Sequence, residues 1–219
     1  SQRTALLRPF IMLLDIFIMP AMFLVAGYFT LPTLMKNGFA AFWQNKIRRI
    51  VLPWIAGVLL FAPLITYMRF VSRMPTPPSY FSFWPDQFFS VAHFNQGHYW
   101  FLGNLTWFFL LLSLAYCSNP SAFARRSEPS RPSTCFLILY GLSIAGMLFA
   151  VTLYFHPDGW YNRLIIAFQQ TRILPNFCYF LLGVYAWRNS WFTEDGYNPR
   201  LAHWLAGAAI TLIPLVYCR

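Results

Sequence analysis

Charged residues are scarce in this 219-residue chain. Asp, Glu, Lys and Arg make up 10% of it, whereas a soluble globular domain carries about 25%. Acidic residues are the scarcer kind, with 6 Asp and Glu against 16 Lys and Arg, so the formal net charge is +10. Hydrophobic residues make up 58% and aromatic residues 21%. This composition excludes an ordinary soluble domain and is typical of an integral membrane protein.

The excess of basic residues must be interpreted in that setting. In a soluble protein it would suggest nucleic-acid binding. Here the Lys and Arg residues fall mainly between long apolar segments, where membrane topology and anionic lipid headgroups account for them. We therefore expect membrane lipids as partners and no nucleic acid.

Several common chemical signatures are missing. The chain has no Ser–His–Asp order, no Gly-rich phosphate loop, no metal-ligand spacing and no internal repeat, so we expect no metal and no bound cofactor. Its four cysteines lack CxxC spacing and a nearby His, and lie in or beside apolar segments. We expect free, buried thiols. The cysteines are Cys117, Cys135, Cys178 and Cys218.

Long apolar runs predict an all-α, polytopic transmembrane helix bundle. The first run, residues 10–31, holds 22 residues and one charge, Asp15, and at 1.5 Å per residue it covers about 33 Å, the thickness of a bilayer core. We treat residues 1–219 as a single transmembrane domain of about six spans. The expected spans are 10–31, 50–69, 98–118, 135–155, 164–187 and 201–218.

The positions of Lys and Arg predict the orientation of the bundle. Loops 32–49 and 119–134 together hold seven of these residues, so we place both loops in the cytoplasm. The amino terminus then faces outward, and a complete protein that starts in the cytoplasm needs one more helix before it. Loop 119–134 is rich in Ser, Pro and Arg and is expected to be flexible. Loop 70–97, rich in Pro and aromatic residues, is expected to lie as a lid in the outer interface.

Polar residues inside apolar segments are candidates for function because burying them unpaired is costly. Asp15 is either an interfacial carboxylate or part of a cavity wall. Arg172 lies about 12 Å deep if its span begins at residue 164, with Gln169 above it. A span that begins at Ile173 would leave Arg172 at the interface but would be short, so we expect the deeper placement.

Two further groups could bind substrate. Lys46, Arg48 and Arg49 form a basic cluster where the second span begins. Such clusters usually only anchor a helix at the cytoplasmic face, but two guanidinium forks and an ammonium also suit a pyrophosphate. His98 and Trp100 lie at the outer mouth of the third span. A lone His is more often a structural group than a base.

Four segments, in order, resemble the membrane acyltransferase type 3 family. They are MPAMFLVAGYF (19–29), KIRRIVLPW (46–54), GHYWFL (97–102) and LPNFCYFLLGV (174–184). The family shows an F-F-x-x-S/A-G-Y/F helix, a basic R-x-x-R followed by L-x-x-P, an H-x-W-F-L helix start and a P-x-F-x-x-G helix. The family's R-x-x-R falls on Lys46 and Arg49, with Lys in place of the first Arg, and its H-x-W-F-L His falls on His98.

This resemblance implies an integral-membrane acyltransferase, of the class that transfers groups other than amino-acyl groups. It moves an acetyl or succinyl group from acyl-CoA (acetyl-CoA or succinyl-CoA) to a hydroxyl of an extracytoplasmic glycan or glycolipid. The implied location is a bacterial inner membrane. The implied donor site is Lys46, Arg48 and Arg49, with Asp15, Trp100, Gln169 and Arg172 lining the substrate cavity.

The chain also departs from the family pattern. The family's principal catalytic His lies in an opening helix that this sequence does not show, and members usually have more than six helices. We therefore expect a fragment without the first and last helices, in which His98 is the remaining candidate base. In an intact relative a His would take the proton from a sugar hydroxyl, which then attacks the thioester carbonyl. The alternatives are a non-catalytic membrane scaffold and a carrier for an anionic or lipid-linked substrate.

Overall fold

The computed structural model describes residues 2–72, 79–89, 94–126, 128–156, 159–163, 166–194 and 196–197. Side chains are described from Ile18 onward, apart from those of residues 86 and 87. The described chain is mostly helical, as the sequence predicts, with one small two-stranded sheet. The predicted span 201–218 lies outside the described residues.

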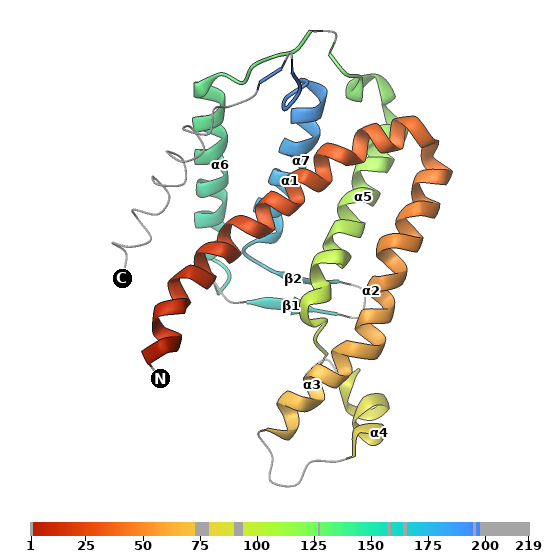
Figure 1. The fold of residues 1–219 in the computed structure, drawn as a ribbon, viewed down its shortest axis with the longest axis vertical. Helices are drawn as coiled ribbons and strands as arrows, with labels where there is room; N and C mark the ends of the chain where they lie inside the picture. The colour runs from red at the N-terminus through yellow and green to blue at the C-terminus, as the bar shows by residue number, and fades with distance from the viewer. Residues whose placement is uncertain are drawn as a thin grey trace.

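The first two predicted spans form one long, bent helical stretch. Helix α1 (Gln2–Lys46) continues through a π-helical turn η1 (Ile47–Val51), α2 (Leu52–Ala56), a second π-helical turn η2 (Gly57–Phe61) and α3 (Ala62–Val71). The break is at Gly38, whose φ of 74° is in the left-handed region that favours glycine. Figure 1 shows the chain reversing there, so that the second arm descends beside α5. The prediction of a loop over 32–49 is therefore wrong, because Gly38 alone makes the turn.

Two further long helices follow. Helix α5 (Trp100–Ser118) follows a 3-10 turn η4 (Gly97–Tyr99), and α6 (Thr134–Thr152) begins after Ser133, whose hydroxyl accepts a hydrogen bond from the Phe136 amide at 3.0 Å. These helices match the predicted spans 98–118 and 135–155. Three stretches of the described chain are long and apolar enough to cross a membrane, Ile18–Val71, Gly97–Ser118 and Thr134–Thr152.

The fifth predicted span is shorter than expected. Two strands, β1 (Trp160–Asn162) and β2 (Ala167–Gln169), form an antiparallel pair, and α7 (Ile173–Arg188) has only 16 residues. The helix therefore begins at Ile173 rather than at residue 164, and it is shorter than the stretches that are long enough to cross a membrane. Arg172 precedes the first helical residue and is exposed. The expectation of an Arg172 deep within a helix is wrong.

The connecting segments gather at two ends of the bundle (Figure 1). The Gly38 bend, the α5–α6 connection and the end of α7 lie at one end. Helices α3 and α4 (Tyr80–Phe83) lie at the other end, and the sheet lies toward it, below α6 and α7. The α5–α6 connection, with its 3-10 turn η5 (Pro120–Phe123), is hydrogen-bonded to the end of α7 rather than loose: the Arg126 amide donates to the Arg188 carbonyl at 3.0 Å, and the Ser130 amide to the Asn189 carbonyl at 3.1 Å.

The aromatic segment after α3 is only partly buried. Phe83 of α4 and Phe88 of the π-helical turn η3 (Trp84–Phe88) are fully buried, in a cluster that includes Trp54 and Phe94. Phe81, however, is 84% exposed. The expectation that loop 70–97 lies as a lid in the outer interface stays a prediction.

The main core lies where α1 crosses α7. A Cβ on Gly27 would collide with the Phe180 carbonyl, and a Cβ on Gly183 would collide with the Leu24 carbonyl. The two backbones therefore touch, as small residues allow in membrane helices. Phe23 and Phe180 are fully buried beside this contact and pack with Phe108 of α5.

Candidate functional site

A cavity lies beside the first turns of α7, where a cation meets two other polar side chains. Its volume is about 350 Å³, and it is bordered by α1, α6 and α7. Arg172, Asn176 and Tyr179 supply the polar groups; Asn176 is buried and Tyr179 half-buried. The rest of the wall is apolar and consists of Met19, Pro20, Ile144, Leu148 and Pro175. An anionic or hydroxylated group would find hydrogen-bond donors here in apolar surroundings.

The strand pair sets the position of Arg172. Gln169 pairs with Trp160 across the sheet, and the chain turns through Thr171 into α7. The Asn176 amide then donates to the Arg172 carbonyl at 3.0 Å, which closes the first helical turn. Arg172 therefore lies between the end of β2 and the start of α7, where it borders the cavity.

Trp100 belongs to the same end of the bundle. Its ring makes an edge-to-face contact with Trp160, with centroids 5.5 Å apart. Through Trp160 the structure connects Trp100 to Gln169, and thus to the chain segment that carries Arg172. Trp100 and Gln169 thus both adjoin Trp160, whereas of these three predicted cavity residues Arg172 alone is among the described lining residues of the cavity.

His98 lies on the turn η4 and is exposed. It is two residues from Gln96, which is 1% exposed and accepts a hydrogen bond from the indole nitrogen of Trp54 at 3.1 Å. Asp15 lies in α1, one helical turn before Met19 of the cavity wall, and its side chain is not described. The structure thus puts His98 beside a fixed segment and outside the Arg172 cavity.

The basic cluster is divided between a packed lysine and two exposed arginines. The Lys46 ammonium lies 4.0 Å from the ring centroid of Phe109 and 5.2 Å from that of Phe42. The Phe42 ring is fully buried and the Phe109 ring nearly so. Such cation–π contacts hold an ammonium in an apolar setting. Arg49 follows Lys46 by three residues in the same helical stretch and is exposed. Two cations held near each other create a place for an anion.

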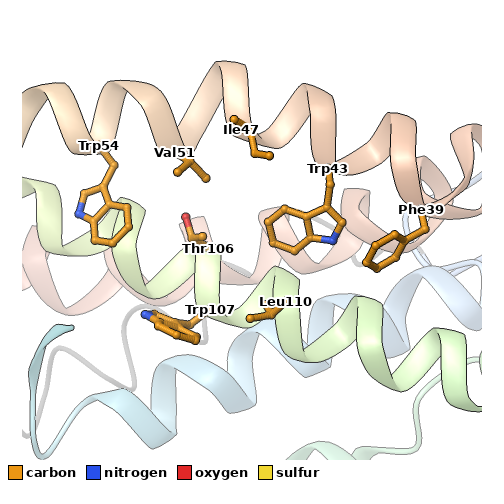
Figure 2. Close-up of a pocket in the computed structure, with 8 residues that line it drawn as sticks. All are labelled: Phe39, Trp43, Ile47, Val51, Trp54, Thr106, Trp107 and Leu110. Atoms are coloured by element: carbon orange, nitrogen blue, oxygen red, sulfur yellow. The ribbon is translucent and has the colours of Figure 1, made fainter. Parts of the chain in front are cut away.

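A second hollow lies between the chain from Phe39 to Trp54 and helix α5 (Figure 2). We call it the tryptophan groove; its volume is about 460 Å³. Its lining consists of Phe39, Trp43, Ile47, Val51, Trp54, Thr106, Trp107 and Leu110.

Sequence reasoning missed several of these residues. Asn176 and Tyr179 follow Arg172 at helical spacing, a signal that was available once α7 was assigned.

Asn104 is 2% exposed, and its side-chain nitrogen lacks a hydrogen-bond partner within the described structure. The thiols of Cys117 and Cys135 are free but exposed rather than buried, and Cys178 is half-buried. Cys218 lies outside the described residues.

Within the described residues, no three His, Cys, Asp or Glu side chains come together to hold a metal ion.

The long apolar helices and their bent, closely crossed arrangement define a helical membrane protein. The chain belongs to the acyltransferase 3 family, since the family's model, described as an acyltransferase domain, matches residues 2–219. Neither a curated protein nor a solved structure gives a match.

Proposed function

We propose that this protein transfers an acetyl or succinyl group from acyl-CoA to a hydroxyl of an extracytoplasmic glycan or glycolipid. Membership of an acyltransferase family supports the general reaction. The observation that carries the finer proposal is the separation of two cationic sites. Lys46 and Arg49 lie on the arm that descends from the Gly38 bend, whereas Arg172 borders a cavity at the start of α7 (Figure 1).

The basic cluster is the proposed donor site. Acyl-CoA carries several phosphates, and Arg49 with Lys46 offers one guanidinium fork and one point charge for them. Lys46 is held by Phe42 and Phe109, so little of its side-chain freedom remains to be lost on binding. Arg48 is next in sequence but lies on another flank of the helix, so Lys46 and Arg49 are the pair that we expect to matter most.

The proposed orientation follows from the basic segments. The Gly38 bend and the α5–α6 connection lie at the same end of the bundle (Figure 1). We propose that this end is cytoplasmic, in an inner membrane of a bacterium, because it carries the basic excess. The acyl donor would then enter from the cytoplasm, and the acceptor would reach the protein from the end that carries the sheet.

The Arg172 cavity is the proposed acceptor site. The Arg172 guanidinium and the side-chain amide of Asn176 can donate to sugar oxygens, and the Tyr179 hydroxyl can donate or accept. His98 at the same end remains the candidate general base. A base at this position would take the proton of the acceptor hydroxyl as its oxygen attacks the thioester carbonyl, and CoA would leave as the thiol. The roles of Asp15, Gln169 and Trp100 as substrate residues stay predictions.

Transfer of radiolabel tests this proposal. Membranes that contain the protein are incubated with labelled acetyl-CoA or succinyl-CoA, and label is measured in the extracted glycans and glycolipids. Arg172→Ala is expected to reduce incorporation about 10- to 100-fold, since a charge-assisted hydrogen bond contributes about 1.5–3 kcal/mol. Arg163→Ala is the matched control, because Arg163 is exposed, lies in the same hairpin and is absent from the cavity wall.

Incorporation of either label that depends on Arg172 supports the proposal. No incorporation above that of membranes without the protein would contradict it and would favour a scaffold. Equal incorporation by wild type and Arg172→Ala would contradict the proposed acceptor site alone.

A further inference from the structure

The connection between α5 and α6 is tied to the end of α7 by two arginine side chains that reach in opposite directions. The Arg125 Nε donates to the Ser190 hydroxyl at 3.0 Å. The Arg188 Nε donates to the Ala124 carbonyl at 3.4 Å. The Arg126 amide, which donates to the Arg188 carbonyl, joins the same two segments. Two cations from distant parts of the sequence therefore lie across one small interface, and we call Arg125 and Arg188 the arginine clip.

The outer edges of both guanidinium groups are left without a protein partner. Each group uses its Nε in the clip, and the described part of the chain offers neither side chain a further hydrogen bond or an ion pair. Arg125 is exposed and Arg188 half-buried, so neither is sealed within the protein. The terminal nitrogens of an arginine form a planar fork that fits two oxygens of one phosphate.

Aromatic packing holds the clip in place before anything binds. The Arg125 Cζ lies 5.8 Å from the ring centroid of Trp187, a cation–π contact. The indole nitrogen of Trp191, which is 4% exposed, donates to the Ser130 carbonyl at 2.9 Å and fixes the connection to the end of α7. An arginine that is already ordered loses less conformational entropy when it binds a ligand.

The backbone that carries Ser190 adopts an uncommon conformation. Ser190 has a φ of 57° and Phe192 a φ of 62°, in the left-handed region that bulky side chains rarely occupy. Such residues are concentrated at ligand clamps and other functional sites, where the surrounding contacts maintain them. Here the conformation presents the Ser190 hydroxyl to Arg125.

From this arrangement we propose that the arginine clip is a binding site for one phosphate group. The forks of Arg125 and Arg188 donate to its oxygens, and its charge offsets the repulsion between the two cations. An anionic lipid headgroup or a soluble phosphate ester can supply the group, since the clip lies at one end of the bundle beside tryptophans, which are typical of a membrane interface (Figure 1). The site uses none of the residues proposed for acyl-CoA or the acceptor and does not depend on that reaction.

Shifts of the melting temperature test the clip and separate the two sources. The purified protein in a non-ionic detergent is unfolded thermally, followed by circular dichroism, with dihexanoyl phosphatidic acid, inorganic phosphate or dihexanoyl phosphatidylcholine. We expect phosphatidic acid, inorganic phosphate or both to raise the melting temperature, by about 3–6 °C at ten times the Kd. A response to phosphatidic acid alone would assign the site to a lipid headgroup, and a response to inorganic phosphate would assign it to a free phosphate. Phosphatidylcholine should have little effect, because its choline offsets the phosphate charge.

Three variants locate the binding site, each compared with its own melting temperature without ligand. Arg125→Gln/Arg188→Gln should weaken binding at least about tenfold, the effect of two cations near a phosphate. Arg131→Gln is the matched control, since Arg131 is an exposed cation of the same connection. Ser190→Ala keeps both charges but removes the hydroxyl that positions Arg125, and it should weaken binding about threefold. This variant decides the question if the double variant does not fold.

No shift with either phosphate compound would overturn the proposal, as would an equal shift with phosphatidylcholine. A shift that survives the double variant, or that Ser190→Ala leaves unchanged, would show that the phosphate does not bind at the clip. A loss as large in Arg131→Gln as in the double variant would show an effect of net charge alone, and it would overturn the proposal too.

Discussion

The α1–α7 crossing and the tryptophan groove are two helix–helix contacts built from similar apolar residues, but they are packed in opposite ways. At the crossing, Gly27 and Gly183 bring the backbones together and no space remains. At the groove, Trp43 and Trp54 keep the second arm and α5 apart, and about 460 Å³ stays open. Small residues thus let two helices touch at the crossing, while large rings with hydrogen-bonded nitrogens border the hollow.

Gly183→Val should give the largest effect, because it forces the two backbones at the crossing apart. We expect a loss of about 3 kcal/mol or more of unfolding free energy, the upper range for overpacking. Unfolding in detergent, followed by circular dichroism, measures it. Gly146→Val is the matched control, since a Cβ at Gly146 of α6 meets nothing within 4 Å. Equal stability of the two variants would contradict the close crossing.

Gln96→Leu should have an intermediate effect, since it removes the acceptor of Trp54 and the donor to the Arg163 carbonyl, which lies 3.4 Å from Gln96 Nε2. It leaves the Trp54 indole nitrogen buried without the acceptor that now lies 3.1 Å away, which costs about 1–3 kcal/mol. The double variant Gln96→Leu/Trp54→Phe removes both partners and should recover part of this loss. A double variant less stable than the sum of the two single variants would contradict this explanation.

Trp43→Phe should have the smallest effect, about 1 kcal/mol or less. The Ser113 hydroxyl that accepts from Trp43 also donates to the Leu110 carbonyl at 3.0 Å, so it stays satisfied in the variant. The same unfolding measurement compares this variant with Gln96→Leu. If Trp43→Phe proves the more destabilising, the Trp43 end rather than the Trp54 end of the groove is the supporting wall.

The helices were predictable from the sequence because long apolar runs leave few other structures in a membrane. The bend at Gly38 was not, since the polar residues around it suggested a loop, and one glycine in the left-handed region suffices to reverse the helix. The glycines at positions 27 and 183 were visible in the resemblance motifs. Their contact was not visible, because it depends on how two distant helices cross.

The candidate site likewise has features that the sequence predicts and features that it does not. Arg172 could be singled out because a cation in an apolar run is costly to bury. Its depth could not be predicted, since the two three-residue strands before it are too short to show an alternating pattern. The proximity of Lys46 and Arg49 follows from helical spacing. The contact of Lys46 with Phe109 requires α5 to be in place, and no local pattern encodes it.

Binding of acetyl-CoA and succinyl-CoA to the purified protein tests the donor site most directly. Titration calorimetry compares the wild type, Lys46→Ala/Arg49→Ala and the control Lys36→Ala, which removes an exposed cation on the other side of the Gly38 bend. We expect the wild type and the control to bind one of the two donors, and the double variant to bind it at least about tenfold more weakly. Equal binding by the double variant, or none by the wild type, would contradict the proposal that Lys46 and Arg49 hold the acyl donor.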